Sequence, residues 1–166
     1  MNPLSWPFRL HCLLGALVCA GLLAYALFVQ HVLFIDPCPM CVLQRVAFAA
    51  FGLVCLMGAA HGPKKARGRA IYGVLAGICG VAGGLVAAQH VRLQHLPADE
   101  VPACGPGLNY MLDTFPVLDA MAMVLRGSGE CAKVDWTFAG LSMPEWTLFC
   151  FVSLILAALY AGFRHR

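Results

Sequence analysis

The sequence predicts an all-α membrane protein, a four-transmembrane-helix bundle formed by a single integral membrane domain over residues 1–166. Hydrophobic residues make up 61% of the chain and charged residues only 11%, against roughly 25% charged residues in an average soluble domain. Four apolar runs each approach the roughly 20 residues needed to cross the hydrocarbon core of a bilayer. The runs cover about residues 10–29, 42–60, 70–88 and 146–163.

The distribution of charge predicts how the bundle is oriented in the bilayer. Basic residues gather in the short loop at Lys64, Lys65, Arg67 and Arg69 and near both chain ends, whereas acidic residues lie in the other two loops. Because basic loops stay on the cytoplasmic side, both termini are expected in the cytoplasm. The outer loops, at about residues 30–41 and 89–145, then face the opposite side. The net charge of +3 reflects this topology and gives no indication of a nucleic-acid partner.

The first outer loop ends in a Cys-x-x-Cys pair formed by Cys38 and Cys41. Pro37 and Pro39 fix the backbone φ angle and remove N–H donors, so this segment is expected to be a rigid turn. The second apolar run follows as a helix, which places Cys41 at a helix N-terminus, where the dipole stabilises a thiolate. Arg45 lies one turn further along the same face and adds a positive charge. Cys41 is therefore predicted to be an activated cysteine.

The third run is rich in glycine and ends close to a histidine. The spacings Gly73-x-x-x-Gly77 and Gly80-x-x-x-Gly84 allow close contact between helices, and packing alone explains them. His90 follows at the outer surface and has two interpretations. It is either a solvated residue at a helix end or a hydrogen-bond donor to a lipid-soluble ligand that also reaches the first outer loop.

The long second outer loop carries two further cysteines. Cys104 lies in a segment rich in Pro and Gly, which can reach another protein, and Cys131 follows the Gly-Ser-Gly break at residues 127–129. The apolar pattern between these cysteines predicts short helical pieces on the membrane surface. Trp136 and Trp146 are expected to anchor the return of the chain to the fourth run at the interface.

Four cysteines thus face the outer side, and their arrangement allows three kinds of site. An oxidising compartment favours disulfides, and four cysteines allow three pairings, of which Cys38–Cys41 with Cys104–Cys131 is the most local. A structural staple explains the second pair but not the first, because so small a ring constrains little of the unfolded chain. A metal site of four thiolates fits less well, because only one pair has Cys-x-x-Cys spacing. We therefore assign no metal ligands.

A redox relay explains both pairs. In this interpretation a dithiol in the mobile loop meets a protein substrate, and the activated dithiol at the membrane surface passes the electrons onward. The final acceptor must be reachable from the lipid, and a quinone from the membrane quinone pool satisfies this condition.

Two segments resemble the bacterial disulfide bond formation protein B (DsbB) family. They are Cys38-Pro-Met-Cys41-Val-Leu-Gln44-Arg45 and the stretch from Glu130 to Trp146. With four spans and both loop cysteines, the resemblance covers nearly the whole chain. It implies a protein-dithiol:quinone oxidoreductase of the bacterial inner membrane, with its active loops in the periplasm. Such an enzyme reoxidises a DsbA-like periplasmic thiol oxidase and passes the electrons to ubiquinone or menaquinone.

The resemblance also implies roles for individual cysteines. Cys104 would form the mixed disulfide with the reduced partner, and Cys131 would then exchange with Cys38. Cys41 would be left as a thiolate facing the quinone.

For the quinone site, the resemblance implies two cofactor-binding residues. Arg45 would stabilise the thiolate and a quinone oxygen, and His90 would line the site. Gln44 stands where some members of the family carry an acidic residue, so a charge beside Arg45 is missing here.

Two other functions stay open from the sequence. A quinone reductase similar to vitamin K epoxide reductase also has four spans and a Cys-x-x-Cys, although in those proteins the pair typically opens a later span. A disulfide-stapled membrane scaffold would need no turnover. Replacing Cys41 by Ser discriminates between these classes, because a scaffold would keep its function and an oxidase would lose it.

Overall fold

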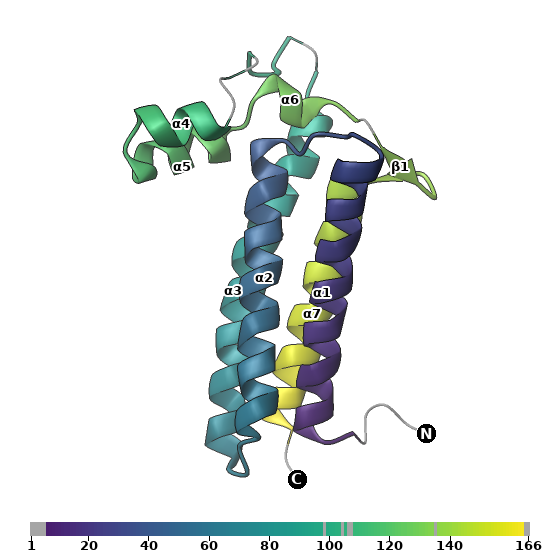
Figure 1. Ribbon diagram of the computed structural model, residues 1–166, viewed down its shortest axis with the longest axis vertical. Coiled ribbons are helices and arrows are strands. Elements are labelled where there is room, and N and C mark those ends of the chain that lie inside the picture. The colour runs from purple at the N-terminus through teal and green to yellow at the C-terminus, as the bar shows by residue number, and fades with distance from the viewer. Residues whose placement is uncertain (1–5, 98, 104, 106–107, 135, 165–166) are drawn as a thin grey trace.

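The computed structural model describes residues 6–97, 99–103, 105, 108–134 and 136–164. Four long helices run side by side, and the start of the first and the end of the last lie at the same end of the bundle (Figure 1). Each helix contains one predicted apolar run and extends beyond it. The helices are α1 (Phe8–Val32), α2 (Pro39–His61), α3 (Ala66–Gln94) and α7 (Met143–Phe163).

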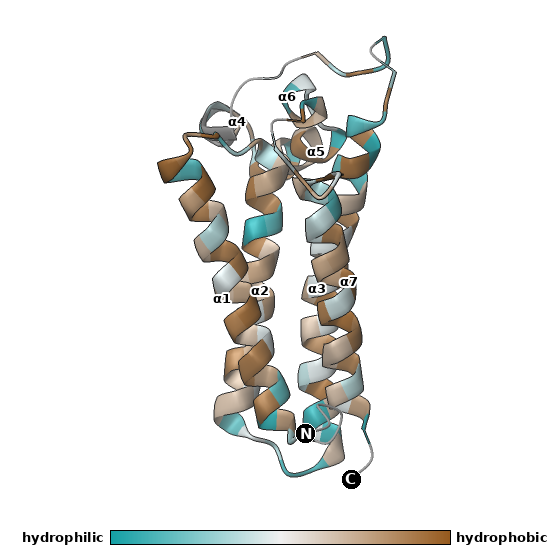
Figure 2. Ribbon diagram, turned by 90° about the vertical axis from the view of Figure 1, so that its right-hand side faces the viewer, coloured by the Kyte–Doolittle hydropathy of each residue, from teal (hydrophilic) through white to brown (hydrophobic). Residues whose placement is uncertain are grey.

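All four helices are long and apolar enough to cross a bilayer. Hydrophobic residues cover most of their length (Figure 2), and large side chains such as Leu17, Leu85 and Phe149 point outward and are exposed. A soluble protein rarely exposes so much apolar surface, whereas the hydrocarbon core of a bilayer accommodates it. The predicted fold class, an all-α membrane protein with four spans, is confirmed.

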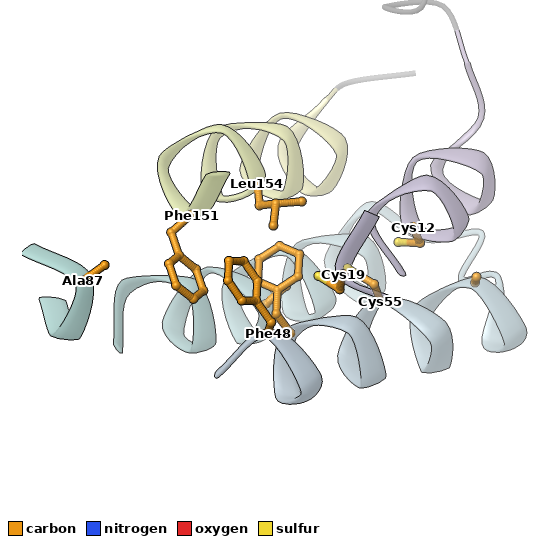
Figure 3. Close-up of a cluster of buried hydrophobic side chains, with 10 residues drawn as sticks. Cys12, Cys19, Phe48, Cys55, Ala87, Phe151 and Leu154 are labelled. Carbon is orange, nitrogen blue, oxygen red and sulfur yellow. The ribbon is translucent and has the colours of Figure 1, made fainter. Parts of the chain in front are cut away.

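The core of the bundle is built around aromatic side chains of α2 and α7. The rings of Phe48 and Phe151 stack with centroids 3.9 Å apart and an interplanar angle of 6°, and Leu154 and Ala87 lie in the same cluster (Figure 3). Gly83 of α3 makes this packing possible. A Cβ atom at that position would lie only 2.3 Å from Cζ of Phe151.

The predicted role of the glycine spacings is correct only in part. A Cβ at Gly73 would lie 2.9 Å from the carbonyl oxygen of Ala158, and one at Gly80 would lie 2.5 Å from Cγ1 of Ile155. Gly77 and Gly84 leave ordinary van der Waals room, with nearest atoms at 3.5 and 3.7 Å. The close contacts of α3 therefore follow one helix face through Gly73, Gly80 and Gly83, and not the two four-residue spacings as such.

Short elements cover the end of the bundle that lies away from the chain ends (Figure 1). The predicted short helices are present here as α4 and α5, and a further helix and a hairpin follow. The elements are α4 (Leu108–Thr114), α5 (Val117–Arg126), α6 (Gly129–Ala132), β1 (Thr137–Phe138) and β2 (Leu141–Ser142). The strands pair antiparallel through the turn at Ala139 and Gly140, both with positive φ, which is the geometry of a tight two-residue hairpin.

A second apolar cluster attaches these short elements to the bundle. Val124 of α5 and Cys131 of α6 are buried with Met40 of α2 and Leu93 of α3. Gly127 turns the chain between α5 and α6 with φ of 84°, and a Cβ there would lie 2.2 Å from Cδ1 of Leu93. This packing holds α6 against the N-terminal end of α2.

Candidate functional site

The Cys-x-x-Cys pair forms the N-terminus of α2. Cys38 is the N-cap residue, with extended backbone angles (φ −65°, ψ 162°), and its Sγ accepts a hydrogen bond from the backbone N–H of Cys41 at 3.4 Å. Pro39 occupies the first helical turn, where a backbone N–H is not needed. Cys41 therefore lies in the first turn of a helix, where the partial positive charge of the helix end favours a thiolate.

Three elements bring Cys38, His90 and Cys131 together. The Sγ atoms of the two cysteines and a ring nitrogen of the histidine all lie within 4.8 Å of one another, and Nε2 of His90 is 3.7 Å from Sγ of Cys38. His90 on α3 is 3% exposed and Cys131 on α6 is 1% exposed. His90 is thus a buried residue of the cluster and not a solvated helix end. The two sulfur atoms and the imidazole nitrogen of this cluster could also hold a soft metal ion.

The environment of Cys131 keeps its side chain protonated in the dithiol state. The pKa of this thiol is raised above its usual value of 9.0, first by a hydrogen bond with Cys38 and then by burial. The Oγ atom of Ser128 lies 3.8 Å from the same sulfur. A thiol of high pKa is a strong nucleophile once ionised and a poor leaving group.

A chain of hydrogen bonds across three helices supports His90. Nδ1 of His90 is 3.1 Å from Nε2 of Gln44 on α2, and Oε1 of Gln44 accepts a 2.7 Å hydrogen bond from Oγ1 of Thr147 on α7. Oγ1 of Thr147 is also 2.9 Å from the carbonyl oxygen of Pro144. Gln44 is only 3% exposed, so its amide is satisfied by these contacts and it fixes the orientation of the imidazole. In the sequence, only the family resemblance draws attention to Gln44, through a missing charge, and nothing indicates Thr147.

Arg45 connects α2 to α1. Its guanidinium donates hydrogen bonds to the carbonyl oxygen of Ala26, at 3.1 Å, and to Oε1 of Gln30. Arg45, Cys38 and Cys41 border the same cavity. The residue therefore holds two helices together as well as placing a positive charge near Cys41.

A cavity of about 710 Å³ lies beside the cysteines, between the upper halves of the four helices and the second outer loop. Cys38, Cys41, Arg45 and His90 all contribute to its wall. The rest of the lining is mostly apolar and includes Phe48, Tyr25, Trp136 and Trp146. Its size falls within the roughly 300–1,000 Å³ of known cofactor and ligand sites.

The structure therefore brings together five of the six predicted site residues. Cys38, Cys41, Arg45 and His90 line the cavity, and Cys131 contacts the cluster from α6. The sixth, Cys104, lies outside the described residues. The eight cysteines that the structure does describe are free thiols, so the predicted disulfide pairing stays a prediction.

The fold and this cluster define a class: a four-span membrane protein with a cluster of cysteines at one end of the bundle. Comparison with known proteins gives the family. The family model described as Disulfide bond formation protein DsbB matches residues 8–161, and the chain belongs to that family.

Individual relatives agree with this assignment over most or all of the chain. A disulfide bond formation protein B of Xanthomonas campestris pv. campestris (strain 8004) is 51% identical over 166 residues, which cover 100% of this chain and 96% of the relative. Proteins of the same name from Saccharophagus degradans and Azoarcus sp. are 49% and 47% identical over 146 and 148 residues. These alignments cover 88% and 89% of this chain and 87% and 88% of the two relatives. The chain is therefore a multi-pass membrane protein with a role in disulfide bond formation.

Proposed function

We propose that the protein oxidises a DsbA-like dithiol protein and passes the electrons to ubiquinone or menaquinone. The observation that carries this proposal is the position of the Cys38 sulfur. It accepts a hydrogen bond from the backbone of Cys41, and it lies within 4.8 Å of the Cys131 sulfur, although Cys38 and Cys131 are far apart in the sequence. One sulfur can thus exchange with two partners in turn.

The relay begins with two disulfides, Cys38–Cys41 and Cys104–Cys131. A thiolate of the reduced partner attacks Cys104, forms a mixed disulfide and releases Cys131 as a thiolate. Cys131 then attacks Cys38, so that the Cys38–Cys131 bond forms and the Cys38–Cys41 bond breaks. Cys41 leaves with the electron pair. The second thiolate of the partner attacks its own mixed disulfide, which releases the oxidised partner and leaves Cys104 reduced.

The environments of the two terminal sulfurs give the central exchange a direction. The hydrogen bond with Cys38 and then burial raise the pKa of Cys131, so its thiolate is a strong nucleophile and a poor leaving group. Cys41 lies at a helix N-terminus near Arg45, and both stabilise negative charge on its sulfur. The disulfide therefore moves from Cys41 to Cys131, which leaves the charge beside the cavity.

The residues around the cavity fit a quinone. The wall is mostly apolar, as the ring and its tail require, and Arg45 and His90 supply N–H donors suited to carbonyl oxygens. To complete the cycle, the Cys104 thiolate attacks Cys131, which forms the Cys104–Cys131 disulfide again and releases Cys38 as a thiolate. Cys38 and Cys41 are then both reduced, and a quinone at this site would take up two electrons and two protons as their disulfide forms again. Arg45 would orient the ring, and the buried His90 would hold a proton at Nε2 close to the reacting sulfur.

The charge distribution supports a bacterial inner-membrane location with the thiol centre in the periplasm. Lys64 and Lys65 lie in the loop between α2 and α3, at the opposite end of the bundle from Cys38 (Figure 1). By the positive-inside rule, this end faces the cytoplasm. Disulfide exchange then takes place in the oxidising compartment.

A quinone reduction assay tests the proposal. The purified protein is mixed with a reduced thioredoxin-like dithiol protein and a soluble ubiquinone analogue, and the quinone absorbance is followed. We expect loss of the absorbance only when both proteins are present, and no loss with the Cys41→Ser variant. The matched control is Cys79→Ser, whose thiol lies in α3 away from the cavity lining, and which should react like the wild type. Absence of quinone reduction by the folded wild type would contradict the proposal and favour a disulfide-stapled scaffold.

A further inference from the structure

We propose that the dithiol state of the protein binds a divalent cation of the zinc class through Sγ of Cys38, Sγ of Cys131 and Nε2 of His90. This inference concerns the reduced thiols alone and does not depend on a quinone or on a protein partner. It assigns a metal site where the sequence predicted none, because the three donors come together only in the fold.

The geometry of the three donors fits tetrahedral zinc. Zinc binds sulfur at about 2.3 Å and imidazole nitrogen at about 2.0–2.1 Å, so a tetrahedral site has ligand atoms roughly 3.5–3.8 Å apart. Nε2 of His90 and Sγ of Cys38 are 3.7 Å apart, and all three donor atoms lie within 4.8 Å of one another. Only a small movement of Cys131 is needed to complete the three-ligand set. Three protein ligands leave the fourth position for water.

The charge and the donor type also favour such a cation. Binding converts two thiols to thiolates and releases two protons, so the divalent cation and its ligands together carry no net charge. This balance matters because Cys131 and His90 are almost fully buried. Thiolate and imidazole donors select zinc-like ions over the hard cations magnesium and calcium.

The hydrogen bonds behind His90 can support the bound state as well. For Nε2 to bind a cation, Nδ1 must carry the ring proton and donate it to an acceptor. The amide of Gln44, turned by 180°, presents its oxygen to Nδ1, and its NH₂ group then donates to Oγ1 of Thr147. The Thr147 hydroxyl in turn donates to the carbonyl oxygen of Pro144, which it already contacts at 2.9 Å. In this arrangement the imidazole, the amide and the hydroxyl each keep a hydrogen-bond partner.

Oxidation state would control this site. A disulfide that includes Cys38 removes its thiolate, so the cation binds only the reduced protein. Conversely, a bound cation occupies the electron pairs with which Cys131 and Cys38 would exchange disulfides. The cation therefore arrests the thiol centre in its reduced state until a chelator removes it.

Cobalt(II) is the probe for this proposal, because thiolate ligation gives a charge-transfer absorption band. The full-length protein, reduced and kept anaerobic in detergent micelles, is titrated with Co²⁺ and then with Zn²⁺. We expect a band that saturates at one cobalt per protein, disappears when zinc displaces the cobalt, and is absent after the thiols are oxidised. Cys131→Ser should lose the band. Gln44→Leu should weaken binding about 10- to 100-fold, as loss of a hydrogen bond to a ligand does in other sites.

The thiols of Cys12 and Cys55, which lie in the buried core cluster and not among the three donors, provide the control. Cys55→Ser should retain the full band. The proposal is overturned if the reduced wild type gives no thiolate band, or if the band survives in Cys131→Ser and is lost in Cys55→Ser. Should Cys131→Ser fail to fold, Gln44→Leu and Cys55→Ser decide the result, because an unchanged affinity in the former or a lost band in the latter also overturns it.

Discussion

Replacing Gly83 by Ala tests the packing that positions the site. The added methyl group would lie 2.3 Å from Cζ of Phe151 and 2.7 Å from Cβ of Ala47. Neither atom can move freely, because the Phe151 ring is stacked on Phe48 and a Cβ atom is fixed by its backbone. Such overpacking costs about 1–3 kcal/mol of folding stability, while Ala in place of Gly in a helix returns about 0.8–1.0 kcal/mol. The net loss is therefore about 0–2 kcal/mol.

Gly84→Ala is the matched control for this change. It receives the same gain in helix propensity, but the nearest atom to its Cβ is Cβ of Phe151 at an ordinary 3.7 Å. The two variants should therefore differ in free energy of unfolding by about 1–3 kcal/mol, with Gly84→Ala the more stable. Unfolding in mixed micelles, followed by the loss of helical circular dichroism, measures this difference. Equal stabilities would refute the close packing of Phe151 on Gly83.

Three further substitutions probe the site and the elements above it. Arg45→His removes the two hydrogen bonds to α1. It should raise the apparent KM for the quinone analogue several-fold while the helical content stays the same. An unchanged KM would count against the role given to Arg45. Thr147→Val leaves the buried amide oxygen of Gln44 without its donor and should lower the free energy of unfolding by about 1–3 kcal/mol. Its control is Ser153→Ala, which loses only an exposed hydrogen bond within its own helix and should lower the free energy of unfolding by less than about 0.5 kcal/mol. Gly127→Ala places a methyl 2.2 Å from a leucine side chain of α3 and should expose the α6 thiol to faster alkylation, measured by mass spectrometry. Gly140→Ala has a similar positive φ but open space around it, so an equal effect on the alkylation of Cys131 would show that backbone strain alone is responsible.

The sequence predicted the four helices well because apolar runs of bilayer length have few alternative structures. It indicated the apolar part of each helix and not where the helix itself ends. The helix α3 continues through Gln89 to Gln94, since a helix does not stop where the hydrocarbon ends, and only the apolar part of it leaves a composition signal. The hairpin at Thr137–Ser142 and the one-turn helix α6 are too short for any periodic pattern to indicate.

The sequence predicted those residues of the site whose chemistry depends on neighbours close to them in the sequence. The Cys-x-x-Cys spacing and the neighbouring Arg45 identified the start of α2. The approach of Cys131 to Cys38 depends on how α5 and α6 pack on Leu93, and only the family resemblance anticipated that these two cysteines react. The roles of Gln44 and Thr147 follow from contacts between three helices. The available signal was a polar residue within an apolar run, which must find a partner in the bundle interior.

The central claim is that the Cys38 sulfur exchanges with both Cys41 and Cys131. Disulfide mapping tests it most directly. The oxidised protein, freed of quinone, is mixed with one equivalent of a reduced dithiol protein, quenched with acid, alkylated and digested for mass spectrometry. The account predicts a peptide pair joined by a Cys38–Cys131 disulfide, with Cys41 recovered as an alkylated thiol. An intact Cys38–Cys41 disulfide beside a reduced Cys131 would contradict it.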